Sequence, residues 1–382
     1  MDFDFSEEHN ALRSMVREFA DNRIAPNSQQ WDADHHFPTD VVREMGNLGL
    51  FGITADERWG GAGADFTSLC IAIEEVARVD QSMAITIEAG VSLGINPIHA
   101  FGSDEQKAHW LPDLVAGQTL AGFGLTEPGA GSDAGATATK AVLDGDEWVI
   151  NGSKSFITNS GTDMTSVVTI TARTGPDEIS TILVPAGTAG FIVDPAYAKM
   201  GWRASDTHGL TFEDCRVPAE NLLGERGRGF HQFLSTLDDG RVALAAMAVG
   251  VLQACLEESV QYANDRHAFG KPIGSNQAIA FKIADIEVMT QAARALTYKA
   301  AWLKDQGKPN QYETSIAKYH ASEAAVHAAN ECMKIFGSYG FSTEYPAERL
   351  YRDAKSLQIV EGTSNVQKLI ISGIACGHTP NR

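Results

Sequence analysis

Helical spacing of apolar residues characterises the first third of the chain. Apolar side chains recur three or four positions apart, as in amphipathic or buried helices, over residues 12–19, 69–79 and 81–101. Ser6 is well placed to cap the first of these helices, and Pro26 is well placed to end it. We therefore expect an N-terminal helical domain over residues 1–118.

Short runs of apolar and β-branched residues replace this pattern in the middle of the chain. They cover residues 147–150, 155–158, 166–171, 180–184, 190–193 and 209–212. Asp144-Gly145 and Asn151-Gly152 are dipeptides typical of hairpin turns, so each predicts a turn between two short strands. The expected structure is a middle domain of antiparallel strands over residues 119–229.

Long helices are predicted again from residue 230 onward. They cover residues 230–266, 277–304 and 311–336, with a last helix expected from Ser364. The first stretch contains no proline and is apolar on most faces, as in an interior helix, while the alanines of the third let neighbouring helices approach closely. Helices, a sheet and then a helical bundle over residues 230–382 give an α+β fold.

Acidic residues outnumber basic ones by 49 to 30, and the formal net charge is −19. This balance argues against nucleic acid or an anionic membrane surface as the main partner, because both require a basic footprint. It is still compatible with a small polyanionic ligand, since a few local cations and backbone N–H groups can bind one.

The five cysteines are dispersed, and none has the spacing of a zinc or CxxC site. We therefore expect free thiols in a reducing compartment and no metal site. The acidic start of the chain, MDFDF, lacks the features of a signal or transit peptide, and no uninterrupted apolar run is long enough to cross a bilayer. The expectation is a cytoplasmic protein without a membrane span.

The sequence Glu361-Gly362-Thr363-Ser364 contains a candidate catalytic carboxylate. Ser364 and Gln367 have the spacing of a capping box, so a helix is expected to begin there with its free N–H groups next to Glu361. Gly362 removes a side chain that would hinder close approach. Glu361 could then act as a base beside a bound ring; the alternative is a surface glutamate in a turn.

A glycine-containing loop, TEPGAGSD at residues 126–133, is a second candidate. Its backbone N–H groups can turn towards an anion or a planar ring, although an ordinary turn after a strand is an equal alternative. Asp238 and Arg241 lie three positions apart, which also suits a surface ion pair. Arg266 ends a long helix, where a cation is often only a partner of the helix dipole.

Taken together, six segments resemble the acyl-CoA dehydrogenase family over essentially the whole chain. They are TEPGAGSD (126–133), FITN (156–159), LDDGR (237–241), DRHAFGKPI (265–273), FGSYGFSTEYPAERLYRDAK (336–355) and IVEGTSNVQKLII (359–371). The resemblance implies the three-part fold above, with a four-helix bundle at the C-terminus, and a homotetramer built as a dimer of dimers. It also implies FAD as cofactor, acyl-CoA as substrate and an electron-transfer flavoprotein as electron acceptor.

The resemblance also assigns roles to individual positions. Those that match FAD contacts are Phe123, Leu125, Thr126, Ser132, Phe156, Ile157, Thr158, Arg266, Phe269, Gln277, Lys334, Gly337, Ser338, Thr363 and Asn365. Of these, Arg266, Phe269 and Gln277 would hold the FAD of a neighbouring subunit. Those that match acyl-CoA contacts are Ser132, Asp238, Arg241, Tyr351 and Gly362.

This chain departs from the family pattern at three of these positions. The family commonly has Trp where this chain has Phe156, and an aromatic ring is kept. Lys334 and Ser338 replace a usual Gln and Gly in the segment that backs the FAD pyrophosphate. A lysine could supply a cation to the phosphates, but its geometry differs from that of an amide. These replacements therefore bear on the affinity and pose of FAD and not on its identity as the cofactor.

The family mechanism would make Glu361 the base that removes the substrate α-proton while flavin N5 accepts the β-hydride, giving a trans-2-enoyl-CoA. Some branches place the base near position 240 of the long helix, which is Gly240 here. An acyl-CoA oxidase or flavin monooxygenase on the same scaffold, and a non-catalytic CoA-ester-binding scaffold, are the alternatives. Short straight and short branched acyl groups are both open, although the C-terminal sequence resembles short-chain members.

Overall fold

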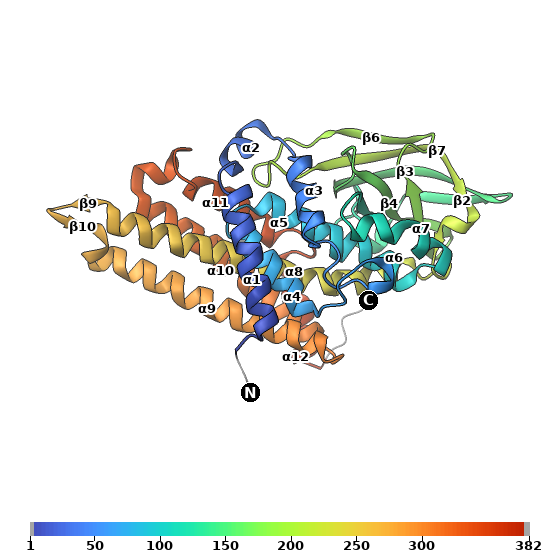
Figure 1. The fold of residues 1–382 in the computed structure, drawn as a ribbon. Helices are drawn as coiled ribbons and strands as arrows, with labels where there is room; N and C mark the ends of the chain where they lie inside the picture. The colour runs from blue at the N-terminus through green and yellow to red at the C-terminus, as the bar shows by residue number, and fades with distance from the viewer. Residues whose placement is uncertain (1–3, 378–382) are drawn as a thin grey trace.

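The computed structural model describes residues 4–377 and shows three parts that follow one another along the chain (Figure 1). The sheet lies at one end of the molecule, the long C-terminal helices extend to the other end, and the N-terminal helices lie between them. The N-terminal helices are α1 (Glu7–Phe19), α2 (Ser28–Asp34), α3 (Thr39–Asn47), α4 (Phe66–Ala77), α5 (Gln81–Glu88), α6 (Asn96–Phe101) and α7 (Asp104–Val115).

The start of α1 is formed as its sequence predicts. The Ser6 side chain accepts a hydrogen bond from the His9 N–H at 3.1 Å, which satisfies one of the free donors of the first turn. The helix continues as a π-helical turn over Ala20–Ile24 and ends before Pro26. Deeper inside, every residue of α4 is buried, and this helix contacts α1, α8 and α9. The N-terminal part therefore packs directly onto the C-terminal bundle.

The middle part is a sheet with the strand order β6-β7-β3-β2-β4-β5-β8, with β1 paired to β4. The strands are β1 (Leu120–Gly124), β2 (Lys140–Asp144), β3 (Glu147–Thr158), β4 (Thr165–Gly175), β5 (Glu178–Pro185), β6 (Phe191–Ala196), β7 (Thr207–Pro218) and β8 (Leu222–Leu223). Most pairs are antiparallel, as expected, but β1 runs parallel to β4 and β2 meets β4 in a parallel bridge. The expected antiparallel arrangement is therefore confirmed for most pairs, and the contacts of β1 and β2 with β4 depart from it.

The two predicted hairpin turns have different outcomes. Gly145 lies in the turn between β2 and β3 with a φ of 67°, so the first prediction is confirmed. Asn151-Gly152 does not form a turn, because β3 runs straight through it and carries a bulge where it pairs with β7. Gly152 has a φ of 148° and passes so close to Thr139 that a Cβ would lie 2.6 Å from the Thr139 Cα. Close approach of the backbone explains this glycine.

The C-terminal part contains the long helices that the sequence predicts. They are α8 (Gly229–Asp265), α9 (Gln277–Asp305), α10 (Gln311–Phe336), α11 (Ala347–Ala354) and α12 (Ser364–Ala375), and the short hairpin β9 (His267–Ala268) and β10 (Lys271–Pro272) lies between α8 and α9. Figure 1 shows this hairpin at the end of the bundle that points away from the sheet. The domain limits given above stay predictions.

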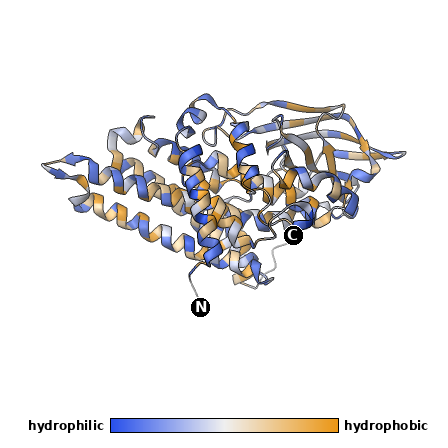
Figure 2. Ribbon diagram, viewed as in Figure 1, coloured by the Kyte–Doolittle hydropathy of each residue, from blue (hydrophilic) through white to orange (hydrophobic). Residues whose placement is uncertain are grey.

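Helix α8 is the interior helix of this bundle. It is long and apolar enough to cross a membrane by length and composition, with a mean hydropathy of 1.4 in its most apolar window, but 78% of that window is buried within the protein. It contacts α4, α9 and α10, and Figure 2 shows hydrophobic residues concentrated where these helices meet. Packing within the bundle accounts for the apolar character of α8.

Candidate active site

Glu361 lies in the short loop between the turn Lys355–Gln358 and α12. Its φ is 52° and that of Gly362 is 91°, so two successive residues adopt left-handed backbone conformations. For a non-glycine residue this conformation costs about 1 to 3 kcal/mol and persists only where neighbouring groups hold it. The loop is therefore held in a shape that the chain would not adopt by itself.

Three side chains from different helices hold this loop by its carbonyl groups. Arg241 Nε of α8 donates to the Glu361 carbonyl at 3.1 Å, and Lys318 Nζ of α10 donates to the Gly362 carbonyl at 2.9 Å. Gln367 Nε2 of α12 donates to the same Gly362 carbonyl at 3.0 Å. The backbone that carries Glu361 is thus fixed from three sides.

The helix after the loop begins one residue away from the expected cap. Thr363 is the N-cap of α12, and its hydroxyl accepts from the Val366 N–H at 3.3 Å. Ser364, the expected cap, donates its hydroxyl to Glu323 instead, and Gln367 bonds the loop rather than the cap backbone. The capping box prediction was wrong in register, although the start of the helix at Ser364 is confirmed.

The oxygens of the Glu361 carboxylate are buried, and neither accepts a hydrogen bond from an N–H or hydroxyl group of the described residues. It rests on α8 at Gly240, where an added Cβ would lie 2.2 Å from Oε2. A side chain at position 240, where an alternative base was considered, would therefore occupy the space of the Glu361 carboxylate. Glycine at this position leaves that space free. The surface-glutamate alternative is wrong.

Burial raises the pKa of Glu361 to about 7, against the opposing effects of Glu88, Arg241 and Lys318. A carboxyl with a pKa near neutral pH is suited to general base chemistry, because it is a stronger base than an ordinary glutamate yet still ionises. The nearby Arg241 is only 5% exposed and pairs with Asp238 at 2.7 Å. These two residues are thus not merely a surface ion pair.

Lys318 is a residue of this site that sequence reasoning missed. It is 1% exposed, and burial lowers its pKa to about 8 while the charge of Glu361 opposes the fall. Its carbonyl partner lies 44 residues away along the chain. The sequence shows a lysine among the apolar positions of a helix, which could have marked Lys318 as unusual. No local pattern predicts that it binds the Gly362 carbonyl.

The loop predicted to contact a flavin begins where β1 ends. Lys154 on β3 is buried and donates to Glu127 at 2.7 Å and to the Leu125 carbonyl at 3.4 Å. The Ser155 N–H donates to the Thr126 carbonyl at 2.8 Å. The buried Lys154 therefore holds the Leu125 carbonyl and the backbone of β3 holds that of Thr126. Sequence reasoning did not find the Lys154–Glu127 ion pair.

Glu127 also holds the far side of the glycine-containing loop. Its carboxylate accepts hydrogen bonds from the Ala138 N–H at 2.7 Å and the Thr139 N–H at 3.1 Å. Ser132, near the tip of the loop, is exposed. The loop is therefore shaped by a buried carboxylate at its base, and its tip is open to solvent.

Phe123 and Phe156 are the aromatic residues of this region. Phe123 stacks on Phe233 of α8, with ring centroids 3.9 Å apart. Phe156 lies at a bulge of β3 with a φ of 59°; it is 63% exposed and stacks on Tyr197 at 4.4 Å. An exposed aromatic ring held by its backbone offers a face to another planar group.

The two residues that follow Phe156 in the FITN segment are less exposed than Phe156. Ile157 is buried in the core of the sheet, so only its backbone could contact a cofactor there. Thr158 is half-buried at the end of β3, opposite Thr207. At the start of α12, Asn365 is exposed.

The remaining predicted FAD positions lie at the other end of the bundle. Arg266 ends α8 and Phe269, 96% exposed, is at the tip of the β9–β10 hairpin, while Gln277 begins α9. Gly337 and Ser338 are exposed at the end of α10. Figure 1 places the hairpin far from the sheet. The structure therefore does not bring this set together with Glu361 within one chain.

Lys334 is ion-paired in this structure. Its Nζ lies 2.5 Å from Glu331, which also binds Lys282. These two lysines lower the pKa of Glu331 to about 2 against the effect of its burial. Lys334, which replaces the usual Gln of the family, is therefore part of a cluster with Lys282 and Glu331 at the same end of the bundle.

The Tyr351-Arg352-Asp353 segment is largely structural. Arg352 pairs with Asp32 and with Glu348, each at 2.6 Å. The buried Asp353 accepts from the Trp202 N–H at 2.6 Å. Tyr351, the predicted substrate contact, is half-buried beside them.

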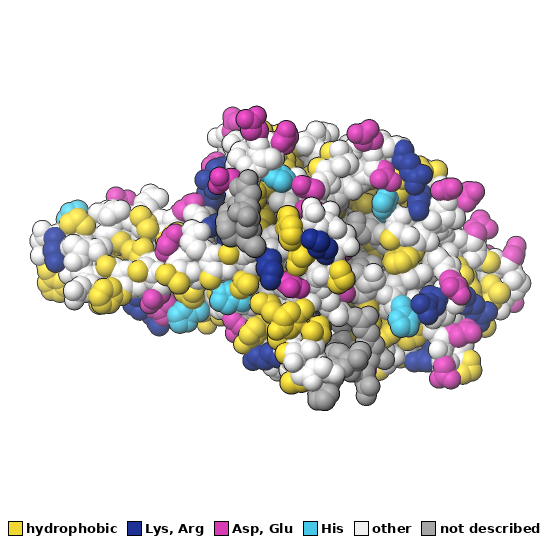
Figure 3. Space-filling model, turned by 90° about the horizontal axis from the view of Figure 1, so that it is seen from below, with side chains coloured by type: hydrophobic (Ala, Val, Ile, Leu, Met, Phe, Trp, Pro, Cys, Tyr) yellow, Lys and Arg dark blue, Asp and Glu magenta, His cyan; other side chains and the backbone are white. Residues whose placement is uncertain are grey.

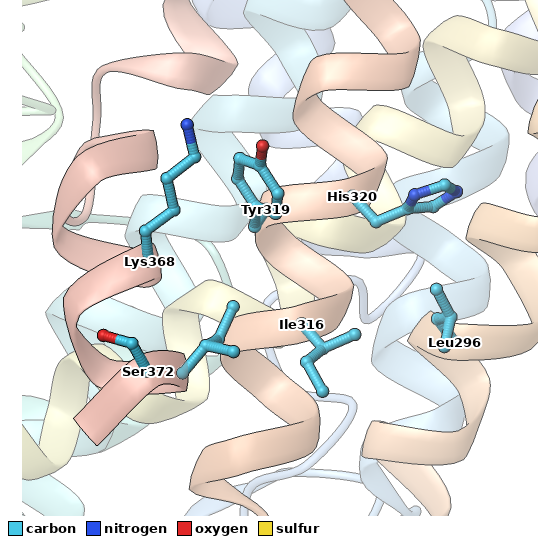
Figure 4. Close-up of a pocket in the computed structure, with 7 residues that line it drawn as sticks. Leu296, Ile316, Tyr319, His320, Lys368 and Ser372 are labelled. Carbon is cyan, nitrogen blue, oxygen red and sulfur yellow. The ribbon is translucent and has the colours of Figure 1, made fainter. Parts of the chain in front are cut away.

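A separate groove lies on the bundle, between α9, α10 and α12. It measures about 450 Å³ and is lined by Leu296, Ile316, Tyr319, His320, Lys368, Ile371 and Ser372. Figure 4 shows these side chains on α9, α10 and α12, with Lys368 above the ring of Tyr319. The groove is separate from the buried carboxylate of Glu361.

Three domain models of the acyl-CoA dehydrogenase family match this chain in order. The N-terminal domain matches residues 6–118, the middle domain residues 122–215 and the C-terminal domain residues 227–374. The short-chain specific acyl-CoA dehydrogenase of Rattus norvegicus mitochondria is 45% identical, over 96% of this chain and 90% of its own length. The short-chain specific acyl-CoA dehydrogenase of Clostridium acetobutylicum is 42% identical, over 98% of this chain and 99% of its own length.

Solved structures agree with these relatives. Butyryl-CoA dehydrogenase from Megasphaera elsdenii has a TM-score of 0.96 at 40% identity, over 98% of this chain and 100% of that one. A chain in a structure of the electron transferring flavoprotein of Acidaminococcus fermentans has a TM-score of 0.96 at 40% identity, over 98% and 99%. An acyl-CoA dehydrogenase of Bacillus anthracis complexed with FAD has a TM-score of 0.94 at 35% identity, over 98% and 68%. The predicted fold is confirmed, and the chain belongs to the acyl-CoA dehydrogenase family.

Proposed function

We propose that this protein is an FAD-dependent acyl-CoA dehydrogenase that converts a short acyl-CoA to its trans-2-enoyl-CoA with Glu361 as the base. The observation that carries the proposal is the Glu361 carboxylate, buried without an N–H or hydroxyl donor among the described residues and resting on Gly240. A buried carboxylate without such a donor is costly unless a ligand or a proton completes its surroundings. No observation favours the oxidase or the non-catalytic scaffold.

The residues at the predicted flavin positions fit such a cofactor. The exposed ring of Phe156 and the fixed backbone of Leu125 and Thr126 can contact a planar ring system. FAD, when bound, supplies the acceptor for the β-hydride. The protein's own part is to hold the thioester with its α-carbon at Glu361, to keep water away and to bind the enolate oxygen, a role we assign to the Glu361 backbone N–H.

The α-proton is transferred to a Glu361 oxygen as the C–H bond breaks. A thioester α-proton is a weak acid, so the base must be both strong and ionised, and a carboxyl with a pKa of about 7 meets both needs at neutral pH. Arg241 and Lys318 keep the carboxylate in place through the carbonyls of its loop. They act as positioning residues for the reaction.

Glu361→Gln tests this proposal. The variant keeps the size of the side chain and removes the base, so it should bind FAD and fold normally while reduction of the flavin by acyl-CoA falls by about four orders of magnitude. Bleaching of the flavin absorbance under anaerobic conditions measures this step. Glu361→Asp keeps a carboxylate on a side chain that is one methylene shorter, so it should retain part of the rate of flavin reduction. Near-normal bleaching by Glu361→Gln would refute the assignment.

The acyl group is proposed to be short. This proposal rests on the relatives, which include short-chain specific and butyryl-CoA dehydrogenases. The same bleaching assay on the wild-type protein should show the highest kcat/KM with butyryl-CoA or a short branched acyl-CoA and a decline towards octanoyl-CoA. A maximum at octanoyl-CoA would contradict the short-chain proposal without affecting the role of Glu361.

The assembly is proposed to be a homotetramer in which FAD sites lie between subunits. Two observations support it: the predicted FAD positions fall at opposite ends of one chain (Figure 1), and the bundle has an exposed apolar surface. That surface includes Phe281, Val288 and Trp302 on α9 and Leu369 and Ile374 on α12. Figure 3 shows hydrophobic side chains gathered on the face below these helices. Such a surface suits contact with another subunit.

An electron-transfer flavoprotein is the proposed acceptor of electrons from the reduced cofactor. It is supported by the similarity to the chain in the structure of the Acidaminococcus fermentans electron transferring flavoprotein. A cytoplasmic location is proposed as well, in agreement with five cysteines that are all free thiols.

A further inference from the structure

His208 on β7 lies between the two strands next to which the stacked aromatic residues of the sheet are found. It is opposite Ile157 of β3 and Ala196 of β6 in the strand ladders. The residues next to these two partners are Phe156 and Tyr197, whose rings stack with centroids 4.4 Å apart. His208 is therefore level with this aromatic pair on the strand between its two members.

Both ladders are irregular at this level. The pairing of β3 with β7 shifts register just before Ile157, and that of β6 with β7 shifts register just before Ala196. A register shift leaves backbone groups without ladder partners. The positions of Phe156 and Asp194, which lie at the two shifts, therefore depend more on side-chain contacts than those of regular strand residues. The His208 ring supplies such contacts.

Each ring nitrogen of His208 binds an oxygen atom of a different segment. Nδ1 lies 2.6 Å from the carbonyl oxygen of Asp194 in β6, and Nε2 lies 2.7 Å from Oδ1 of Asp206. The other carboxyl oxygen of Asp206 accepts hydrogen bonds from the N–H groups of Ser160 and Gly161, each at 2.8 Å. These two N–H groups directly follow the FITN segment. The ring therefore connects β6 to the end of that segment.

These contacts require a hydrogen on both ring nitrogens. A carbonyl oxygen only accepts hydrogen bonds, so Nδ1 donates to Asp194. The carboxyl of Asp206 accepts two backbone N–H groups, which favours its ionised form, and a carboxylate likewise only accepts. Nε2 therefore donates as well, and His208 is an imidazolium that donates two hydrogen bonds.

The groups around the ring come from every segment packed against it. Asp206 is the carboxylate in direct contact, and the charge of Lys199, in the loop between β6 and β7, acts in the opposite sense. From β6 the ring meets the carbonyl of Asp194, whose carboxylate accepts from the Thr211 hydroxyl. From the segment after β3 it meets Gly161, where an added Cβ would overlap the ring.

We propose that His208 is a positioning residue for FAD: as an imidazolium it ties the FITN segment to β6, so that the stacked rings of Phe156 and Tyr197 form a fixed wall for the flavin. This inference rests on the proposed function, in which Phe156 contacts the cofactor. When His208 loses a proton, Nδ1 keeps the hydrogen that the Asp194 carbonyl requires, so the bond to Asp206 is lost. The end of the FITN segment is then released, and the protein holds FAD less tightly.

The direction of the His208 pKa gives the pH range of this effect. The hydrogen bond to Asp206 raises the pKa of His208 above its ordinary value, against the effect of burial. A group with a raised pKa stabilises the folded state fully below its unfolded pKa, about 6.5 for histidine, and loses that contribution as the pH rises through the folded pKa. The wall should therefore be held at about pH 6 and loosened at alkaline pH.

The rate of FAD release measures how firmly the wall holds the cofactor. In the diluted wild-type holoenzyme, followed by the fluorescence of free flavin, the rate constant should rise about tenfold between about pH 6 and about pH 9, as one charge-assisted hydrogen bond is lost. His208→Asn keeps a donor for the Asp194 carbonyl and has none that reaches Asp206, so it should release FAD at the fast rate at every pH. A His208→Asn variant that keeps the wild-type rise with pH would overturn the proposal.

Lys199 could produce a rise of its own, because burial lowers its pKa to about 8. Lys199→Arg stays charged over this range, so it should retain the rise if His208 causes it; a rise that disappears in Lys199→Arg would contradict the proposal. His99→Gln is the matched control, because Nε2 of His99 on α6 lies 3.0 Å from Asp56 in a second histidine–aspartate pair. Its FAD release should match that of the wild type at each pH.

A combined substitution separates action through the wall from a general loss of stability. Tyr197→Leu removes the ring that stacks on Phe156, so the wall no longer depends on His208. Adding His208→Asn to Tyr197→Leu should then change the rate of FAD release by less than about twofold, because residues that act through one another are not additive. A full effect of about tenfold in that background would show that His208 acts elsewhere and would refute the role in the wall.

The charge of the ring can be measured directly in protein whose histidines carry carbon-13 at Cε1. The chain has 11 histidines, and the magnetic resonance signal missing from His208→Asn, or from His208→Gln if the first variant fails to fold, belongs to His208. That signal should be that of a charged ring at about pH 7, where an ordinary histidine is mostly neutral. A neutral His208 ring at about pH 6 would rule the proposal out.

The two hypotheses fail in different ways. If the purified protein binds no FAD, the proposed function fails, and the role of His208 falls with it. If Glu361→Gln retains flavin reduction, the proposed base is wrong while the role of His208 stands. If FAD is bound but its release is the same in His208→Asn and the wild type at every pH, only the inference about His208 fails.

Discussion

Gly240 illustrates how closely single residues determine the geometry of the base. A Cβ at this position would lie 2.2 Å from Glu361 Oε2 and 3.0 Å from Oε1, well inside van der Waals contact. Gly240 sits in the interior of α8, where glycine costs about 1 kcal/mol relative to alanine. The helix therefore carries a local cost that is explained by the space the carboxylate occupies.

Gly240→Ala should accordingly stabilise the helix locally and still impair the enzyme. The added methyl group displaces the Glu361 carboxylate, and a misplacement of about 1 Å in a catalytic group can lower the rate by about a hundredfold. We expect kcat/KM for acyl-CoA to fall by that order while FAD content stays near that of the wild type. Steady-state assays and the flavin absorbance measure the two quantities.

Gly135→Ala is the control for this substitution. An added Cβ at Gly135 meets nothing closer than the Phe230 ring, at 3.8 Å, so activity should be unchanged. Equal activity of Gly240→Ala and the wild type would show that the carboxylate does not need this space during the reaction.

The sequence predicted Glu361 itself but few of the groups that support it. The carboxylate, the glycine after it and the following helix are neighbours along the chain, so their relation could be inferred from spacing. Lys318 and Arg241 reach the same loop from 44 and 120 residues away. Their roles depend on tertiary packing, which no local pattern encodes, and the same holds for the Lys154–Glu127 pair.

At the scale of elements, the contact between α4 and α8 joins the N-terminal part to the bundle. Gly250 of α8 lies against α4, where an added Cβ would be 2.4 Å from the Glu74 carbonyl oxygen and 2.7 Å from the Ala77 Cβ. Both neighbours belong to an entirely buried helix. Neither can move without disturbing the packing of the core.

Gly250→Ala should therefore destabilise the protein, although helix propensity alone predicts a gain of about 1 kcal/mol. Overpacking a dense core typically costs about 1 to 3 kcal/mol, and here the clash is with backbone. The apparent thermal midpoint, measured at one protein concentration and with FAD in excess, should fall by several degrees. A raised midpoint would mean that α4 and α8 separate readily and that the close approach has no energetic importance.

Elements were predicted well where one periodicity ran over many residues. The limits of α10 are those expected from its apolar pattern, and those of α8 and α9 differ by one residue at most. The pairing of strands in the sheet was harder to predict from the sequence, because it joins segments that lie far apart along the chain. Asn151-Gly152 has the composition of a turn, yet pairing of β3 with β7 on both sides keeps it in the strand. The parallel contact of β1 with β4 likewise has no local signal.

At the scale of the whole molecule, the FAD positions inferred from the family resemblance form two separate sets. One set, with Phe123 and Phe156, lies on strands of the sheet; the other, with Arg266 and Phe269, lies at the hairpin at the opposite end of the molecule (Figure 1). Phe269 is 96% exposed, which is unusual for a large aromatic residue without a partner. Both facts agree with a site that one subunit begins and another completes.

Arg266→Glu tests this arrangement when it is combined with Glu361→Gln. Each homomeric variant should be inactive, the first because a carboxylate at a position proposed to bind FAD would repel the phosphates of the cofactor and the second because the proposed base is missing. In a mixed oligomer formed by co-expression, some sites receive Glu361 from one chain and Arg266 from the other. These sites should recover activity that neither variant has alone. Recovery requires that the two residues serve one site from different subunits, so mixed oligomers as inactive as both parents would place each FAD within a single chain.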